Sequence, residues 1–461
     1  MAKTRLLLLL IFLLAACQPS SATPTSTSTP KATATKTPPP TATPIPISNF
    51  DVEEKDLNGV EIEFWHAWFG APAALLDLQV AEFNEENPWG IKVKASYQGS
   101  YNMLFNAVSD TLDTATPPRI VLALPEQTSV WRERGAVKNL SPYIDDPIWG
   151  FSADEKNDIP ASFLAQDQHG DEQVALPAQR TARFLLYNKT WGAELGFDAP
   201  PLTFENFEKQ ACSANKFMRA DENLENDGKG GWIVDFDSMA VLAWMLSFDG
   251  SPLDDNGNYQ FISDKNIDTF KNLKNLYDKG CAWLTTADTP YDQFAARSAL
   301  FITAGMEDFP EIDRAFAEAN NSDTWTVHLL PGAERGVIIT YGSSYTLLET
   351  EDDAEALASW LFIKWMLTPE NQAKFAKSTA LFPLRTSAIE LLSDYEKDNP
   401  HWAQAVGFIE DSENYPQLAS WHKVRYLLED GFEYIFRFNV QAGSVAAILS
   451  QMNTTAQELN K

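Results

Sequence analysis

The stretch Val60-Glu61-Ile62-Glu63-Phe64-Trp65 alternates apolar and charged side chains, which is the pattern of a β-strand with one buried face. Leu75, Leu78 and Phe83 follow at helical spacing, and Ile91-Lys92-Val93-Lys94-Ala95 returns to the alternation of a strand. A helix over residues 101–112 and a buried strand over 119–124 continue the series. Strands that alternate with helices in this order predict parallel sheets of the α/β class.

The same alternation extends towards the C-terminus. A strand is predicted over Ala182–Tyr187, and Thr203 is placed to cap the helix that follows it. Apolar residues recur at helical spacing over 358–365, 424–435 and 445–452, and Pro369 suits the first position of a further helix. About 410 residues follow Asp51, which is enough for two domains with sizeable cores.

The first 50 residues differ in character from the rest. A basic start at Lys3 and Arg5 precedes an apolar run over 6–14, which is too short to span a bilayer and fits a secretory signal peptide. The run ends in Leu14-Ala15-Ala16-Cys17, which resembles the lipobox of bacterial lipoproteins. We expect residues 1–16 to be removed and Cys17 to be lipidated, so that the protein is anchored outside the cytoplasm to the cell membrane. An ordinary signal peptide is the alternative. Residues 17–50 are rich in Ser, Thr and Pro and predict a disordered tether.

Charge and cysteine content limit the partners and the compartment. Acidic residues outnumber basic ones by 64 to 35, and the formal net charge is −29. This charge repels phosphate backbones, so nucleic acid and anionic lipid surfaces are poor partners, but it says nothing specific about the ligand. With Cys17 assigned to the lipid, Cys212 and Cys281 remain. In an oxidising compartment a disulfide between them is favoured, and two buried free thiols are the alternative.

Short motifs spread over most of the folded part carry a family resemblance. They are Ile62-Glu63-Phe64-Trp65-His66, Phe83-Asn84-Glu85-Glu86-Asn87-Pro88, Gly99-Ser100-Tyr101, Arg119-Ile120-Val121, Gly135-Ala136-Val137-Lys138-Asn139-Leu140-Ser141-Pro142-Tyr143, Ala175-Leu176-Pro177, Leu186-Tyr187-Asn188-Lys189, Pro200-Pro201-Leu202-Thr203-Phe204-Glu205, Trp360-Leu361-Phe362-Ile363-Lys364-Trp365, Thr368-Pro369-Glu370-Asn371-Gln372 and Phe382-Pro383-Leu384-Arg385. In this order they resemble the family 1 extracellular solute-binding proteins, which include the maltose-type and multiple-sugar-type receptors of ABC importers. Two positions depart from the family: Pro118-Arg119 stands where Pro-Asp is usual, and Phe204 where Trp is usual.

The resemblance implies two α/β lobes that close over a carbohydrate and deliver it to the permease subunits of an ABC importer. Lobe 1 would comprise residues 51–175 and 338–382, and lobe 2 residues 176–337 and 383–461. The chain would cross between the lobes near Val174–Pro177, Arg335–Ile339 and Phe382–Leu384. No cofactor or metal is expected, and the receptor would act as a monomer.

Candidate ligand residues follow from the chemistry of sugars, whose flat C–H faces stack on aromatic rings and whose hydroxyl groups bond to carboxylate, amide and guanidinium groups. In parallel sheets such residues lie past the carboxyl ends of the strands. The candidates in lobe 1 are Trp65, His66, Trp68, Tyr101, Glu126 and Gln127. Core packing of the tryptophans, and a solvated loop at residues 126–127, are the alternatives.

Further candidates rest on the resemblance. Trp421 lies in a segment that resembles the one presenting a stacking tryptophan in maltose-type receptors. Thr181 stands where those receptors carry a sugar-binding acid, so Arg180 or Arg183 is a substitute, unless either pairs with a surface carboxylate. Approximate alignment adds Trp244, Glu307 and Ser343.

Two other classes of function compete with a transport receptor. A secreted glycoside hydrolase needs two carboxylates about 5–10 Å apart across a cleft, and 64 acidic residues do not exclude that. However, the sequence contains no G-x-S-x-G, H-E-x-x-H, P-loop or C-x-x-C motif, and no two of its five histidines stand at i, i+4. A ligand sensor is the third class. We expect a binding protein and not an enzyme.

Overall fold

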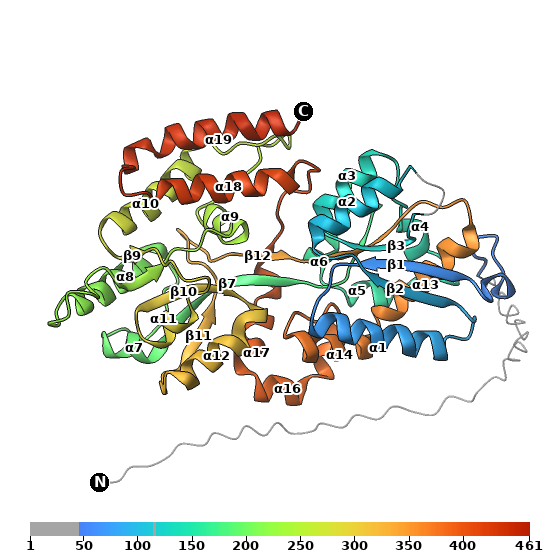
Figure 1. The fold of residues 1–461 in the computed structure, drawn as a ribbon, viewed down its shortest axis with the longest axis horizontal. Coiled ribbons are helices and arrows are strands. Elements are labelled where there is room, and N and C mark those ends of the chain that lie inside the picture. The colour runs from blue at the N-terminus through green and yellow to red at the C-terminus, as the bar shows by residue number, and fades with distance from the viewer. Residues whose placement is uncertain (1–45, 114–116) are drawn as a thin grey trace, which may run out of the picture. The chain divides into compact units, whose positions relative to one another are not determined.

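Two large β-sheets organise the described part of the chain, residues 46–113 and 117–461 of a computed structural model. Each sheet carries its own helices, so residues 46–461 form two lobes (Figure 1). The predicted signal peptide, the lipidated Cys17 and most of the predicted tether lie outside the described residues. The end of that tether is packed on the first lobe, because Asp146 accepts hydrogen bonds from the Ser48 hydroxyl and the Asn49 amide. The folded part therefore begins slightly before the predicted boundary at residue 51.

The first lobe is built on a five-stranded sheet with the order β2-β1-β3-β13-β6. Its strands are β1 (Glu61–His66), β2 (Lys92–Tyr97), β3 (Ile120–Ala123), β6 (Leu176–Pro177) and β13 (Ser344–Leu347). β1 is parallel to β2 and β3, whereas β13 runs antiparallel to β3 and β6. The lobe also contains η1 (Glu54–Leu57), α1 (Ala71–Glu86), α2 (Tyr101–Thr111), α3 (Pro125–Glu133), α4 (Ser141–Ile144), α5 (Ala153–Asn157), α6 (Ala161–Ala165), α13 (Asp353–Met366), α14 (Pro369–Thr379) and the hairpin of β4 (Gln168–His169) and β5 (Glu172–Gln173).

The second lobe is built on a seven-stranded sheet with the order β14-β12-β7-β10-β8-β9, and β11 also pairs with β7. Its strands are β7 (Thr181–Asn188), β8 (Gly230–Ile233), β9 (Ala282–Trp283), β10 (Ala299–Gly305), β11 (Trp325–His328), β12 (Ile338–Tyr341) and β14 (Ser412–Glu413). Its larger helices are α7 (Lys189–Glu194), α8 (Phe204–Met218), α9 (Ser238–Ser247), α10 (Asp264–Asp278), α11 (Tyr291–Ala295), α12 (Phe309–Glu318), α17 (Pro400–Val406), α18 (Trp421–Ile435) and α19 (Val445–Leu459). β7 is antiparallel to its neighbours β10, β11 and β12, so the predicted parallel pairing holds for only part of the sheets, while the α/β class is confirmed.

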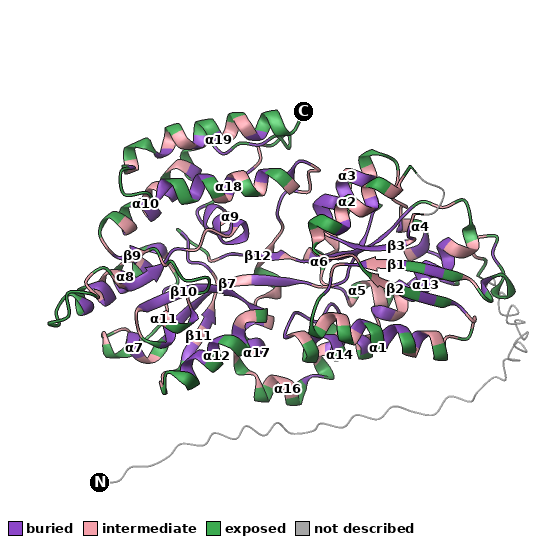
Figure 2. Ribbon diagram, viewed as in Figure 1, coloured by how far each residue is buried: buried purple, intermediate pink, exposed green. Residues whose placement is uncertain are grey.

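Burial along these elements follows the sequence patterns. In β1, Glu61 and Glu63 are exposed while Ile62 and Phe64 are buried, because successive side chains of a strand point to opposite faces. β3 is buried at every position, as is typical of a central strand covered on both faces. At the start of α8 the Thr203 side chain accepts a hydrogen bond from the amide of Asn206, which is the predicted cap. Figure 2 shows the buried residues along the strands and the exposed ones on the outer helices.

All three predicted crossovers between the lobes are displaced in the structure. The last one lies beyond Ser387 and not near Phe382–Leu384, because Arg385 donates to the carbonyl of Leu367 and Ser387 donates to Asp158 of the first lobe. β6 still pairs with β13 of the first sheet, so the first crossover follows Pro177 and ends where β7 begins at Thr181. β12 pairs with β7 of the second sheet, which puts residues 338–341 in lobe 2 and the second crossover at Gly342 and Ser343. The prediction placed the first two crossovers a few residues early, because the sequence of an apolar strand does not indicate which of the two sheets the strand joins.

The apolar core is not divided cleanly between the lobes. The largest cluster of buried side chains includes Phe64 and Phe362 of the first lobe and also Phe184 of β7. The connection runs through Phe382, whose ring centroid lies 5.8 Å from that of Phe163 and 6.3 Å from that of Phe184. A second cluster lies within the second lobe, and a small third one lies between α2, α3 and β3.

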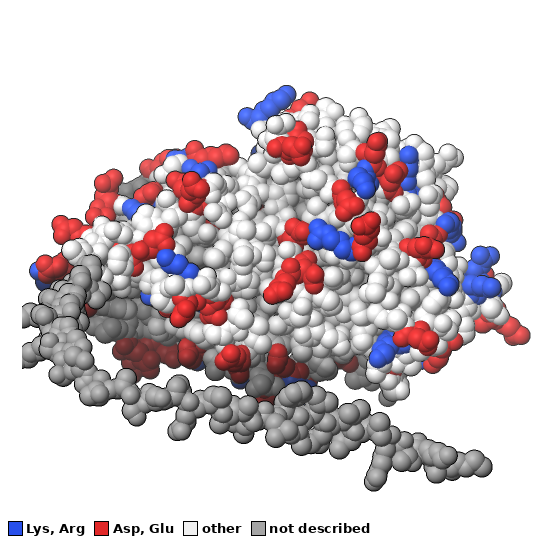
Figure 3. Space-filling model, turned by 180° about the vertical axis from the view of Figure 1, so that it is seen from behind, with Lys and Arg blue, Asp and Glu red and all other residues white. Residues whose placement is uncertain are grey.

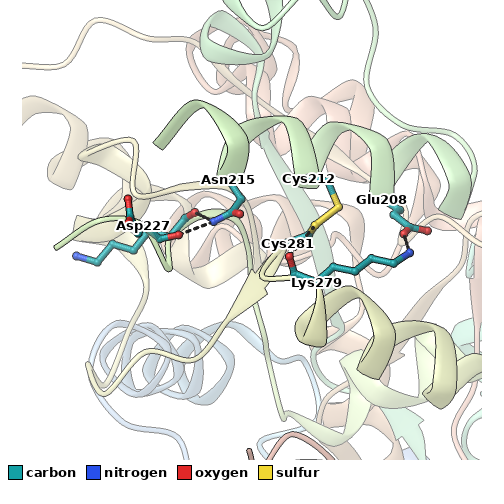
Figure 4. Close-up of a disulfide and its surroundings, with 7 residues drawn as sticks. Glu208, Cys212, Asn215, Asp227, Lys279 and Cys281 are labelled. Atoms are coloured by element: carbon teal, nitrogen blue, oxygen red, sulfur yellow. Dashed lines mark hydrogen bonds and ion pairs between the residues drawn. A yellow bond between two sulfur atoms is a disulfide. The ribbon is translucent and has the colours of Figure 1, made fainter. Parts of the chain in front are cut away.

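Cys212 and Cys281 form the predicted disulfide, which joins α8 to the start of β9 across 69 positions of sequence (Figure 4). Two polar contacts flank it on α8. Lys279 forms an ion pair with Glu208, and the Asn215 side chain donates to the carbonyl oxygen of Asp227 at 2.9 Å. The covalent link therefore lies inside the second lobe and does not restrain movement between the lobes.

Candidate functional site

Three parallel strands of the first sheet bring polar and aromatic residues to the same edge. β1 ends at His66, two residues before Trp68, and the chain after β2 enters α2 at Tyr101. The chain after β3 turns directly into α3, whose second residue is Glu126. Because the carboxyl ends of parallel strands meet at one edge, these side chains lie where ligands bind in such sheets.

Four polar atoms at this edge are buried without a hydrogen-bond partner among the described residues: His66 Nδ1, Trp68 Nε1, Tyr101 OH and Ser343 Oγ. Burial raises the pKa of Tyr101 to about 12, and the neighbouring Ser343 hydroxyl and Trp68 indole act against this shift. Burial also lowers the pKa of His66, which favours the neutral imidazole. Each buried polar group without a partner costs about 1–3 kcal/mol, so four of them at one edge of the sheet make this edge a candidate ligand site.

The second lobe contributes an arginine held by two carboxylates. Arg183 projects from β7, and its Nε donates to Asp235 Oδ2 at 2.8 Å while its Nη1 lies 3.9 Å from Asp237 Oδ2. The hydroxyl of Thr303 on β10 also donates to Asp235. Although burial acts against the charged form, Asp235 and Asp237 raise the pKa of Arg183 above its ordinary value. This arginine is therefore permanently charged and already neutralised by its neighbours.

Glu307 lies beside this group, just past the end of β10. Its Oε2 accepts a hydrogen bond from the Thr181 hydroxyl at 2.7 Å, and its Oε1 lies 3.3 Å from the Tyr341 hydroxyl. The side chain is exposed, yet surrounding protein desolvates it and, with the nearby Asp308, raises the pKa of Glu307. A group that is reached by water and still desolvated lies in a concave part of the surface, which is where ligands bind.

A buried contact joins the two lobes. Glu126 of α3 is 2% exposed, accepts a hydrogen bond from the Tyr415 hydroxyl at 3.0 Å and lies 3.4 Å from Arg425 Nη1 of α18. Glu429, one turn further along α18, is close to both Arg425 and Asp237 and accepts from the amide of Ser238 at 3.2 Å. We call the connected residues from Tyr101 through Glu126, Arg425 and Arg183 to Glu307 the inter-lobe network.

A cavity of about 680 Å³ opens beside this network, and it is lined from both lobes. Arg132 and His169 contribute from the first lobe, and residues 251–253 and 413–418 from the second. Tyr415 belongs to both the cavity wall and the network. The volume is in the range of natural small-ligand sites.

The network has an excess of negative charge. Six carboxylates belong to it or adjoin it, against the two guanidinium groups of Arg183 and Arg425: Glu126, Asp235, Asp237, Glu307, Asp308 and Glu429. Burial raises the pKa of Glu429, Asp237 and Glu307, which acts against the charged form of each carboxyl group. The rear face of the protein shows the same excess of acidic over basic side chains (Figure 3).

Three predicted site residues have structural roles instead. Trp244 lies in the core of the second lobe, with its ring 5.3 Å from that of Phe207 and 5.4 Å from that of Trp232. Arg180 is fully buried, pairs with Asp167 at 2.6 Å and donates to backbone carbonyls of the crossover at residues 342–343. Gln127 accepts from the amide of Leu124 and donates to the carbonyl of Tyr101, so it fixes the turn between β3 and α3.

Two predicted tryptophans lie next to the network without facing it. Trp421 is fully buried in the second-lobe core, where its ring lies 6.1 Å from that of Tyr415. Tyr415 rather than Trp421 therefore presents a ring and a hydroxyl to Glu126. Trp65 is half-buried and packs on the small core cluster near α2 and α3. The prediction rested on the family resemblance for Trp421 and on the position past the first strand for Trp65, yet an indole packs as readily in a core.

The predictions missed several residues of the network. These are Asp235, Asp237, Asp308, Tyr341, Tyr415, Arg425 and Glu429. One signal was available in the sequence: Gly230–Ile233 is a short apolar strand, and the acidic residues 235 and 237 follow it as Glu126 follows β3. Within the described residues, no group of His, Cys, Asp and Glu is arranged to hold a metal ion, and no helix has the length and apolarity to span a bilayer.

Comparisons with known proteins agree with this architecture. The sequence profile described as bacterial extracellular solute-binding protein matches residues 79–404. The sn-glycerol-3-phosphate-binding periplasmic protein UgpB of Salmonella typhimurium is 23% identical over 360 residues, which covers 74% of this chain and 78% of that protein.

Solved structures show the same fold. The sugar-binding protein MalE of Xanthomonas citri superposes with a TM-score of 0.73 at 18% identity, over 87% of this chain and 97% of that one. UgpB of Mycobacterium tuberculosis, in complex with glycerophosphocholine, superposes with a TM-score of 0.68 at 17% identity, over 87% and 98%.

Proposed function

We propose a carbohydrate-receptor function for this chain, which belongs to the family of bacterial extracellular solute-binding proteins. In this proposal it is the binding component of an ABC importer. It takes up a mono- or oligosaccharide outside the cytoplasm and presents it to the permease subunits. The relatives named above bind either sugars or glycerol phosphates, so the nature of the site has to decide between the two.

The observation that carries the proposal is the group of buried polar atoms without partners beside aromatic rings. The indole of Trp68 and the hydroxyls of Tyr101 and Ser343 present hydrogen-bonding groups. A sugar offers many hydroxyls that both donate and accept, together with apolar C–H faces that pack on rings. It would supply the missing partners while it packs on the rings of Trp68, Tyr101 and Tyr415.

The charge of the network supports a neutral ligand over a phosphate. Arg183 is already paired with Asp235 and Asp237, and Arg425 with Glu126, so neither guanidinium is free to compensate an added phosphate. The surrounding carboxylates would repel a phosphate over a distance of several ångströms, because a partly desolvated site screens charge poorly.

The proposed mechanism is closure of the two lobes about their crossovers. The buried pair of Arg180 and Asp167 fixes the geometry of the crossover segments. Opening breaks the contact of Glu126 with Tyr415 and Arg425 and exposes the polar atoms near Tyr101 to water and ligand. A sugar that bonds to both walls then stabilises the closed form, because it gains interactions that the open form lacks.

The remaining parts of the proposal concern location and partners. Lipidation of Cys17 would hold the receptor at the membrane, and the Ser/Thr/Pro-rich residues 18–45 would let it reach the permease. The protein would act as a monomer. It would not transform its ligand, since the relatives are named as binding proteins.

A thermal-shift panel tests the ligand class. Neutral mono- and oligosaccharides are compared with glycerol 3-phosphate, glycerophosphocholine, peptides and divalent metal ions. A sugar at a hundred times its Kd stabilises the native state by about 2.7 kcal/mol, which raises the melting temperature measurably. Chromatography of the incubated sugar checks that it is returned intact. Stabilisation by the phosphate compounds alone, or release of hydrolysis products, refutes the proposal.

A further inference from the structure

The first lobe contains a separate cavity of about 780 Å³. Its walls come from η1, the turn after α1, residues 148–158, α13, the first residue of α14 and Arg385, whose side chain lies against Leu367 and Asp158 of the first lobe. It shares no lining residue with the inter-lobe network or with the cavity beside it. The volume is again that of a small-ligand site, and every wall belongs to one lobe.

Three tryptophans line this cavity: Trp89, Trp149 and Trp365. Trp89 and Trp365 are only half-buried, so part of each indole remains open. Trp89 packs edge-to-face on Trp149 at 6.3 Å, and Trp365 packs edge-to-face on Phe83 at 5.4 Å. These contacts fix the ring orientations, so the indoles form a preorganised apolar surface.

Charged groups at the base of the cavity compensate one another. Lys364 donates to the carbonyl of Gly150 at 2.5 Å and lies 3.8 Å from Glu155. Arg385 donates to the carbonyl of Leu367 at 2.7 Å and lies 3.9 Å from Asp158. With Lys55 and Glu54 at the rim, three cations face three carboxylates. The site offers donors and acceptors without net charge.

We propose that this cavity is a second carbohydrate site, which binds a neutral mono- or disaccharide independently of the inter-lobe site. The balanced charges give no advantage to an anion or a cation, and the charged base disfavours a purely apolar ligand. Fixed indoles next to balanced donors and acceptors suit the C–H faces and hydroxyls of a sugar. Because all its walls lie in one lobe, occupancy does not require the lobes to close.

The test uses ¹⁹F NMR of the protein labelled with 5-fluorotryptophan and titrated with glucose, maltose and cellobiose. The resonances of Trp89 and Trp365, assigned from Trp→Phe variants, are expected to shift with one of these sugars. The resonance of Trp283, a half-buried indole of the second lobe, is expected to stay unchanged. The absence of a shift at both cavity indoles with all three sugars overturns the proposal.

Two variants separate this site from the inter-lobe site. Trp89→Ala should raise the concentration at which the Trp365 resonance shifts by at least tenfold, whereas Trp283→Ala should leave it unchanged. Tyr101→Phe weakens only inter-lobe binding, so the midpoint at Trp365 should stay the same. A midpoint that moves with Tyr101→Phe shows that the indoles report lobe closure, and the second site is then rejected. If no sugar binds at the inter-lobe site but the resonances of Trp89 and Trp365 shift, the proposed receptor function is refuted and the second site is supported.

Discussion

Replacing Tyr101 by phenylalanine removes one hydroxyl and should change folding stability and ligand affinity in opposite directions. In the structure this hydroxyl is buried with no hydrogen-bond partner among the described residues. Its removal relieves the cost of an unpaired buried polar group, so the free energy of unfolding should rise by about 1 kcal/mol. In a protein of this size that raises Tm by about 1–2 °C.

The affinity for the sugar should fall in the same variant. In the wild type the ligand relieves the cost of about 1 kcal/mol and adds a hydrogen bond worth at least about 0.5 kcal/mol. The variant lacks both contributions, so its binding free energy should be weaker by about 1.5 kcal/mol, which corresponds to a Kd roughly 13-fold higher. Isothermal titration with the sugar found in the thermal-shift panel measures this change, and a urea titration of the ligand-free protein measures the stability.

Tyr187 offers a matched control. Its hydroxyl is also buried without a hydrogen-bond partner among the described residues, but it lies in the core of the second lobe, and burial raises its pKa to about 12 as well. Tyr187→Phe should therefore gain the same stability with no change in Kd. An unchanged Kd for Tyr101→Phe would show that the Tyr101 hydroxyl does not contact the ligand. Equal losses of affinity in both variants would show that the effect on binding is indirect.

Three further predictions concern the lobes and their stability. Arg425→Met leaves Glu126 with Tyr415 as its remaining partner. Without ligand, the closed form should then be disfavoured by about 2 kcal/mol, which is roughly 30-fold in population. Small-angle scattering should show a larger radius of gyration, and an unchanged radius contradicts an inter-lobe role for the pair. The double variant Cys212→Ser, Cys281→Ser opens a loop closed across 69 positions and should lose about 4 kcal/mol of stability with ligand affinity retained, as followed by chemical denaturation and titration. Burial lowers the pKa of His328 to about 4 from its ordinary value of about 6.5, so between these values the unfolded chain binds a proton that the native protein does not hold. Stability should thus fall as the pH is lowered from about 6.5 to about 4, by about 2 kcal/mol given the partial exposure of the ring, and the pH profile of His328→Asn should lack that component.

The sequence was sufficient for the local elements and the fold class because those depend on short-range patterns. The alternation at 60–65 gives β1, and the apolar run at 119–124 gives the fully buried β3. The side chains at the carboxyl ends of these strands, His66 and Glu126, were found for the same reason. Position after a strand is a local property.

The second-lobe wall was harder to predict because it is assembled from distant positions. Arg183, Asp235 and Glu307 meet only because β7 pairs antiparallel with β10, and β8 lies on the other side of β10. No spacing along the chain records that arrangement. The family resemblance also misled the choice of aromatic residues. Trp244 and Trp421 fill cores, while the tyrosines at 341 and 415, which combine a ring with a hydroxyl, reach the network.

The apolar contact of Phe382 with Phe163 and Phe184 affects how the protein unfolds. When two halves share buried rings, melting either half exposes part of the surface that stabilises the other. Residues 46–461 should then melt as one cooperative unit, with a van't Hoff enthalpy equal to the calorimetric enthalpy. For the same reason, neither half expressed alone should keep the near-UV dichroism of fixed aromatic packing.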